Sequence, residues 1–172
     1  MPVTDVTNGE FDARGEKTWT TPILFAYDGS ALAALAIERA GQELATSRDA
    51  LVLCVWQPAD VGFEPVTSRL FDVDAANEVR RAAEETADFG AALARDAGFR
   101  AHGLAAEAAP TWKGIVLVAQ THHIGVIVLG AHRRTGLVGH LLGSVTTAVL
   151  SHADCSVFVV HEQSRSTSQV AP

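Results

Sequence analysis

Short apolar runs recur along the chain between residues 22 and 160, and longer segments of mixed polarity separate them. Each run is only a few residues long and rich in β-branched or aromatic side chains, which is typical of strands rather than helices. The run at residues 126–129 is apolar at every position, as in a parallel strand covered on both faces. Strands are therefore predicted at residues 22–27, 51–56, 100–106, 126–129 and 157–160.

The segments between these runs have helical periodicity. Ser30 and Thr111 are good N-cap residues for the first and third of the predicted helices. The predicted helices cover residues 31–45, residues 74–97, a segment beginning near Thr111, and residues 144–152. Their apolar stripes are expected to include Val79, Ala83, Thr86 and Leu93 in the second helix, and Ile115, Val118 and Ala119 in the third.

The resulting order of elements is βαβαβαβαβ, which defines the fold class. Because crossovers between parallel strands are right-handed, such a chain winds into an open sheet covered on both faces. We predict an α/β fold with a twisted, five-stranded, mainly parallel sheet flanked by four helices, Rossmann-like, with strand order 3-2-1-4-5. In such folds the ligand crevice lies at the carboxyl ends of the strands, where the winding reverses.

Length and composition indicate one globular domain. With 172 residues, 48% hydrophobic and 19% charged, the chain suits a single domain at residues 22–161. The polar segments 1–21 and 162–172 are predicted to be flexible tails. No apolar run approaches the roughly 18 residues that a membrane span needs, and the N-terminus lacks the features of a secretory signal. A cytoplasmic protein without membrane association is expected.

The net charge, the cysteines and the histidines indicate which partners and sites to expect. The net charge of -7 opposes binding along a nucleic-acid backbone, so no nucleic-acid partner is expected. Cys54 and Cys155 lie in or beside apolar runs, as buried free thiols do. The histidines lack compact ligand spacing, so no metal site is predicted; those considered were His122, His123, His132, His140 and His152.

Two glycines frame a loop with the features of a phosphate site. Gly130 follows the fourth strand, and after twelve residues Gly143 and Ser144 begin the last helix. A glycine lets backbone approach a ligand, and the free N–H groups of a helix start bind anions. Asp28 ends the first strand nearby, although it could instead form an Asx-turn, and Gly143-Ser144 could be a helix start alone. Neither a Walker A motif nor a Gly-x-Gly-x-x-Gly fingerprint is present.

Four segments carry a resemblance to a known family. They are Tyr27-Asp28-Gly29-Ser30, residues 52–55 (VLCV), residues 128–136 (VLGAHRRTG) and residues 141–145 (LLGSV). Together they resemble the universal stress proteins, a family of the adenine nucleotide alpha-hydrolase-like, Rossmann-like superfamily. The resemblance covers roughly residues 22–161.

That resemblance implies a bound ATP or other adenine nucleotide, with or without Mg²⁺. By analogy, Asp28 would contact the ribose or adenine side, and Val55 and Leu129 would flank adenine. The phosphates would be held by Gly130, Gly143, Ser144, Val145 and Thr146. The family also implies a homodimer through the edge of the C-terminal strand.

One position departs from the family pattern of glycine, two residues, glycine, nine residues, then glycine and Ser or Thr. Its second glycine is Arg133 here. The arginine could block the phosphates, or its guanidinium could replace lost backbone contacts with a charge-assisted bond. We predict that His132 and Arg133 contact phosphate, with Arg134 as the alternative source of the positive charge.

The function expected from these features is that of a stress-response or regulatory protein that binds adenine nucleotide. The alternatives are a dimeric stress protein that acts through protein partners without a nucleotide, a cyclic-AMP binder, and a slow nucleotide hydrolase. An enzyme is disfavoured because no Gly-x-Ser-x-Gly elbow is present, and no catalytic residue is assigned.

Overall fold

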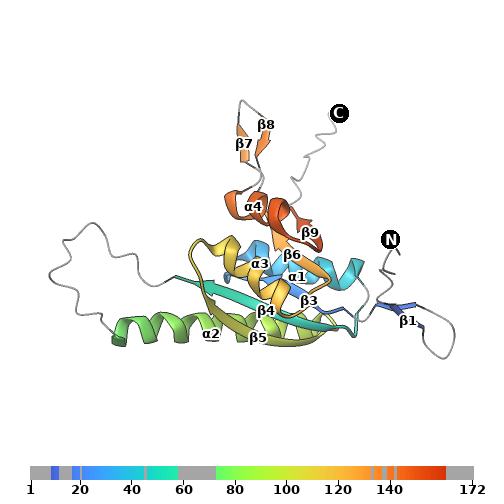
Figure 1. Ribbon diagram of the computed structural model, residues 1–172, viewed down its shortest axis with the longest axis horizontal. Helices are drawn as coiled ribbons and strands as arrows, with labels where there is room; N and C mark the ends of the chain where they lie inside the picture. Colours follow the sequence, from blue (N-terminus) through green and yellow to red (C-terminus); the bar gives the residue numbers. More distant parts are fainter. Residues whose placement is uncertain are drawn as a thin grey trace, which may run out of the picture.

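The computed structural model describes residues 9–11, 17–19, 21–44, 46–57, 73–132, 134–136, 139–141 and 143–161. Its main sheet has five strands in the order β5-β4-β3-β6-β9, and every neighbouring pair is parallel (Figure 1). In chain order this is 3-2-1-4-5, so the predicted topology is confirmed. The strands are β3 (Ile23–Ala26), β4 (Asp49–Trp56), β5 (Arg100–Glu107), β6 (Val126–Gly130) and β9 (Ser156–Val160).

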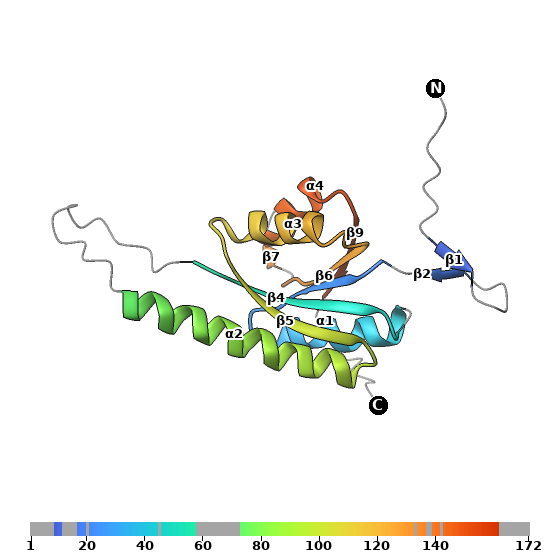
Figure 2. The same cartoon turned by 60° about the horizontal axis from the view of Figure 1, so that its bottom comes forward.

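In the described part of the chain, four helices cover the two faces of this sheet, which confirms the predicted architecture. They are α1 (Ala31–Glu43), α2 (Val73–Asp96), α3 (Thr111–Thr121) and α4 (Ser144–His152). Figure 2 shows α1 and α2 on one side of the sheet and α3 and α4 on the other. Successive side chains of β3 point to opposite faces of the sheet. Phe25 packs in the core beneath α1 and α2, whereas Leu24 packs in the core beneath α3 and α4.

The first helix begins as its sequence predicts, but the third does not. The Ser30 hydroxyl oxygen accepts a hydrogen bond from the Ala33 amide at 3.1 Å, which confirms Ser30 as an N-cap. The prediction that Thr111 caps α3 is wrong, because the N-cap is Pro110 and no side chain caps this end. Thr111 is instead the first helical residue, which leaves its hydroxyl available for other contacts.

Small residues, rather than the expected larger ones, bring α2 close to the sheet. Val79 was predicted on the buried face but is 36% exposed. A side chain at Gly90 would place its Cβ only 2.6 Å from Tyr27 Cδ1 and 2.7 Å from Val52 Cγ1. The buried positions of α2 are mainly alanines, namely Ala83, Ala87, Ala91 and Ala94.

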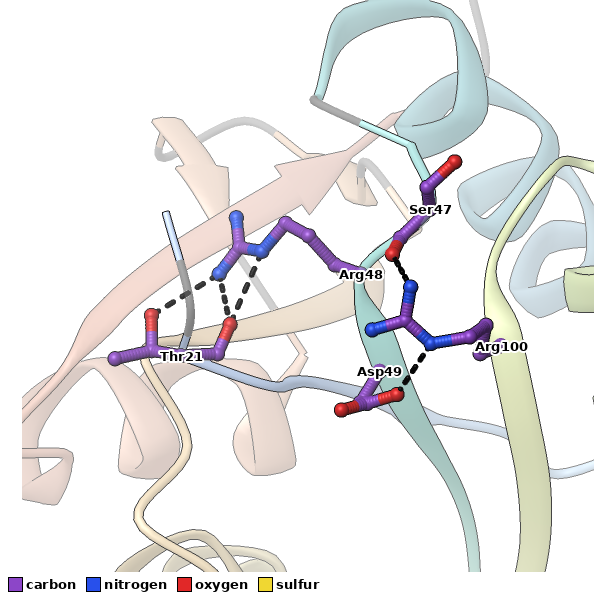
Figure 3. Close-up of polar contacts among 5 residues, drawn as sticks. All are labelled: Thr21, Ser47, Arg48, Asp49 and Arg100. Atoms are coloured by element: carbon purple, nitrogen blue, oxygen red, sulfur yellow. Dashed lines mark hydrogen bonds and ion pairs between the residues drawn. The ribbon is translucent and has the colours of Figure 1, made fainter. Parts of the chain in front are cut away.

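Two arginines tie together the amino ends of strands in the sheet (Figure 3). The predicted site lies at the other end, where the strands finish. Arg48 donates a hydrogen bond from Nε to the Thr21 carbonyl oxygen at 3.0 Å. It donates another from Nη2 to the Thr21 hydroxyl at 3.1 Å. Arg100 donates from Nε to Asp49 Oδ1 at 2.8 Å and from Nη1 to the Ser47 carbonyl. The Arg100 hydrogen bond lowers the pKa of Asp49, and burial lowers the pKa of Arg48. These contacts hold the chain where it enters β3, β4 and β5.

Two short antiparallel ladders lie outside the main sheet, and the sequence did not predict them. β1 (Gly9–Phe11) pairs with β2 (Lys17–Trp19) inside the segment expected to be an N-terminal tail. β7 (Arg134–Gly136) pairs with β8 (Gly139–Leu141) inside the loop between Gly130 and Gly143. This loop therefore contains a short hairpin.

The two cysteines are free thiols in different surroundings. Cys54 is buried as predicted, whereas Cys155 is only half-buried. Burial raises the pKa of both thiols, and the negative charges of Asp28 and Asp154 raise it further for Cys54 and Cys155 respectively. A raised pKa favours the protonated form of a thiol, which is the less reactive one. Within the described part of the chain, no helix is long and apolar enough to cross a membrane.

Candidate functional site

A cavity of about 170 Å³ opens at the carboxyl ends of the central strands. It lies where the winding of the sheet reverses, since α1 follows β3 on one face and α4 follows β6 towards the other. We call the apolar lining the floor, which includes Leu53, Val55, Ile115 and Leu129. We call the polar lining the rim, which includes Asp28, Ser30 and Thr111 together with Thr146, a buried residue.

The early end of β3 creates this hollow. β3 ends at Ala26, which pairs with Leu53 of β4, while β4 runs on to Trp56. On the other side β6 continues to Gly130 and pairs there with β9. The flanking strands therefore extend past the central one, and the turn after β3 lies between them.

Asp28 sits in this turn and belongs to the cavity rim. Gly29 has a φ of +81°, a conformation that favours glycine. The Ser30 amide donates to Asp28 Oδ1 at 3.0 Å, so the Asx-turn considered from the sequence is present. The exposed carboxylate also lines the cavity. Its charge adds to the effect of burial in raising the pKa of Tyr27. Asp28 thus both shapes the turn and faces the cavity.

The start of α4 offers backbone donors to the same cavity. Its N-cap is Gly143, which has no side chain to cap the helix, and the first intrahelical bond runs from the Thr147 amide to the Gly143 carbonyl at 2.9 Å. The amides of the three residues between them precede the helical bonding pattern, and of these residues Val145 and Thr146 line the cavity. α1 and α3 also begin at the rim, through Ser30 and Thr111. Helix N-termini favour negative charge, so the rim suits an anion.

The two glycines that frame the loop have different roles. A Cβ at Gly130 would lie 2.7 Å from the Leu32 carbonyl oxygen of α1, so the fold itself requires glycine there. From its position after a strand, this glycine was expected to let a ligand approach the backbone. The packing of α1 is a sufficient reason for it without a ligand. A Cβ at Gly143 would meet no atom of the described residues within 4 Å, and its φ of −57° suits any residue. The bare backbone at Gly143 is therefore not required by the fold.

The structure brings together most of the residues predicted for the site. Asp28, Val55, Leu129, Gly130, Val145 and Thr146 line the one cavity. Gly143 and Ser144 form the helix start that leads into it. His132 is exposed and lines a different cavity, and Arg133 lies outside the described residues, so its phosphate contact stays a prediction.

That second cavity is larger, at about 740 Å³, and runs along α1 beside the end of α2. Its charged lining residues are Glu38 and Asp96, both acidic. Volume alone would favour this cavity as a ligand site. The smaller one has the chemistry of a binding site, because its apolar floor faces a convergent set of polar groups and an uncapped helix start.

Several residues of the smaller cavity were not predicted from the sequence. Ser30 and Thr111 were predicted only as helix caps, yet both lie on the rim. Each begins a helix directly after a strand of the parallel sheet, and this position at the carboxyl edge could have identified them. The other missed lining residues are Ala26, Tyr27, Ala33, Leu53 and Ile115.

Fold and cavity define a doubly wound α/β protein with a crevice at its topological switch point. The model of the Universal stress protein family matches residues 20–161, and the chain belongs to this family. No curated protein sequence matches the chain.

Solved structures share the fold at low sequence identity. The hypothetical protein MJ0577 has 22% identity and a TM-score of 0.68, over 86% of this chain and 99% of its own. An Arabidopsis thaliana universal stress protein family protein with AMP bound has 14% identity and a TM-score of 0.56, over 84% of this chain and 93% of its own. A universal stress protein in complex with cAMP has 20% identity and a TM-score of 0.52, over 84% of this chain and 98% of its own.

Proposed function

We propose that this universal stress protein binds an adenine nucleotide in the smaller cavity and acts as a regulatory protein in the stress response. The observation that carries the proposal is the uncapped start of α4, which meets an apolar floor and the Asp28 carboxylate in one crevice. Support comes from the AMP and cAMP bound to structural relatives.

The residues of the cavity fit the parts of such a ligand. Val55 and Leu129 offer apolar surface for the base, and Asp28 offers carboxylate oxygens to ribose hydroxyls. The amides at the start of α4 would take the phosphates. Ligand pockets usually measure about 300–1,000 Å³. The cavity of about 170 Å³ therefore suits the base and sugar, with the phosphates over the helix start at its mouth.

Affinity in this arrangement must come from several contacts acting together. A helix terminus contributes about 0.3–1 kcal/mol, and about 2 kcal/mol in favourable geometry. A micromolar dissociation constant requires about 8 kcal/mol. Burial of the base on the apolar floor and hydrogen bonds to the sugar must supply the rest, so the loss of any one contact should weaken binding measurably.

Replacing Asp28 by alanine is expected to weaken AMP binding about threefold to tenfold. The carboxylate accepts from ribose hydroxyls, but its charge also repels the phosphate, which limits the net effect. Isothermal titration calorimetry with AMP, ATP and cyclic AMP measures the affinities.

Asp28→Asn is the matched control, because asparagine keeps an acceptor for the Ser30 amide and so preserves the turn. It is expected to bind AMP more tightly than Asp28→Ala. If wild-type protein binds none of the three nucleotides, the proposed function is wrong.

We further propose a homodimer formed through β9. This strand is an edge of the sheet, and its central residues Val157, Phe158 and Val159 are only half-buried. Light scattering should give twice the monomer mass at micromolar concentrations. Val159→Lys should yield monomer, since it places a charge on this edge. His102→Lys, an exposed position on the opposite edge strand β5, should leave the dimer intact, and a monomeric wild type would contradict the proposal.

A further inference from the structure

The larger cavity runs along α1 beside the end of α2 and, among the described residues, shares only Ser30 with the smaller one. The two helices touch where a Cβ at Gly41 would lie 2.8 Å from the Ala97 carbonyl oxygen. The α1 residues that line the cavity all precede this contact, and they extend from Ser30 to Glu38. Over that length the helix rises about 10 Å. The cavity is therefore elongated, and one of its ends lies near Gly41.

Most of the lining of the larger cavity is apolar. Ala31, Ala34 and Leu35 are three and four positions apart, so they lie on one face of α1. Leu93 and Ala97 add apolar surface from the end of α2. The volume of about 740 Å³ falls within the range of about 300–1,000 Å³ that is usual for small-molecule sites. Size and lining therefore suit the apolar body of an organic ligand.

The two carboxylates of the lining come from the end near Gly41. Glu38 precedes Gly41 by about one helical turn, and Asp96 directly precedes Ala97, which contacts Gly41. His132 also lines the cavity, and none of the described lining residues is a lysine or an arginine. A cavity lined by charges of one sign attracts the opposite charge, so this end favours a cation.

Within the described part of the chain, neither carboxylate forms an ion pair. Arg39 follows Glu38, but its Nη1 donates to Gln42 Oε1 at 3.1 Å. Arg95 precedes Asp96, but its Nη1 donates to a carbonyl oxygen of β5 at 2.9 Å. The Gln42 amide nitrogen donates to Glu38 Oε1 at 3.4 Å, which is a long contact with a neutral group. The charge of both carboxylates is therefore available to a ligand.

We propose that the larger cavity is a second ligand site, which takes an amphipathic organic cation such as a long-chain primary amine. The apolar body of the ligand lies along Ala34 and Leu35, and its ammonium group meets Glu38 and Asp96. Both parts are needed, because exposed ion pairs contribute little by themselves and burial of apolar surface supplies most of the affinity. The sign of its charge disfavours a nucleotide here.

Three probes that share an octyl chain test the sign of the charge, namely n-octylamine, 1-octanol and octanoate. Amide shifts in nuclear magnetic resonance titrations measure their affinities, and they are expected at Leu35, Leu93 and Ala97. Octylamine should bind at least about fivefold more tightly than octanoate, with octanol between them, since two carboxylates attract the amine and repel the acid. Raised salt should reduce this preference. Ethylamine, which lacks the chain, should bind at least about tenfold more weakly than octylamine.

Two substitutions remove charge from the cavity while keeping the shape of the side chains. Glu38→Gln and Asp96→Asn should each lower the preference for octylamine over octanoate, and the double variant should lower it to below about twofold. Asp88→Asn is the matched control, because it removes the same charge from an exposed residue of α2 that is not in the lining. This control should behave as wild type.

Ala34→Leu tests the apolar lining, since the larger side chain occupies part of the cavity. It should weaken octylamine binding at least about threefold, with urea unfolding to show that the variant is folded. Equal affinity of wild-type protein for octylamine and octanoate, an undiminished preference in the double variant, or no shifts with millimolar octylamine overturns the proposal. Shifts at Leu35 and Leu93 that follow protein concentration without a probe would assign the cavity to a second copy of the chain and also overturn it.

Discussion

Replacing Gly130 by valine is expected to lower the free energy of unfolding by about 3 kcal/mol. A Cβ at this position would lie 2.7 Å from the Leu32 carbonyl oxygen and 2.9 Å from Leu32 Cγ, so α1 must move away from β6. Overpacking of this kind typically costs about 1–3 kcal/mol, and valine adds two further methyl groups. Urea unfolding of the ligand-free protein measures the loss.

Gly143→Ala is the matched control for this prediction. Among the described residues, no atom lies within 4 Å of the Cβ position of Gly143, and its φ is −57°. Its replacement should change the free energy of unfolding by about 1 kcal/mol or less, the cost of alanine at an N-cap. Similar losses for Gly130→Val and Gly143→Ala would show that the close contact of α1 with β6 does not explain the first glycine.

Gly143→Ser is expected to weaken AMP binding about tenfold to a hundredfold while leaving the fold as stable as before. A serine at the N-cap accepts a hydrogen bond from the second or third helical amide, here Val145 or Thr146. These are the donors proposed for the phosphate. A hydrogen bond to a charged group contributes about 1.5–3 kcal/mol, so its loss should be large in calorimetric titrations.

Unfolding measurements and the variant Gly143→Ala separate the loss of phosphate donors from other causes of weaker AMP binding. Serine and glycine differ by only a few tenths of a kcal/mol at an N-cap, so unfolding of Gly143→Ser should match wild type. Gly143→Ala adds the same Cβ without an acceptor, and should bind AMP more tightly than Gly143→Ser. Equal weakening in both variants would indicate obstruction by the Cβ, and wild-type affinity in both would place the phosphate elsewhere.

The sequence predicted the fold well because its apolar patterns are local and strong. The uninterrupted run at residues 126–129 became the core of β6, and Ser144–His152 forms a helix with the predicted bounds. α2 shows the limit of such patterns. Its buried face is defined by alanines and by Gly90, whose absent side chain lets the helix lie close to Tyr27. Periodicity of large residues could not reveal this and placed Val79 inside.

The site was predicted in part, because position along a strand determines which residues reach the carboxyl edge. Asp28 and Thr146 follow from that rule together with the family resemblance, and both line the cavity. The hydrogen bond from Gln57 to Thr111 on the rim joins residues 54 positions apart and could not be predicted from either neighbourhood. Likewise, no local pattern indicates where the chain runs after Gly130, and the structure places His132 beside the larger cavity.

Backbone amide shifts during an AMP titration, followed by nuclear magnetic resonance, test the central claim most directly. The largest changes are expected at Val145 and Thr146, where the phosphates would meet the start of α4, and at Leu129 beside the base. The larger cavity serves as the internal reference, through Leu35 and Ala97 in its lining. Shifts that cluster at Leu35 and Ala97, or no shifts at millimolar AMP, would contradict the account.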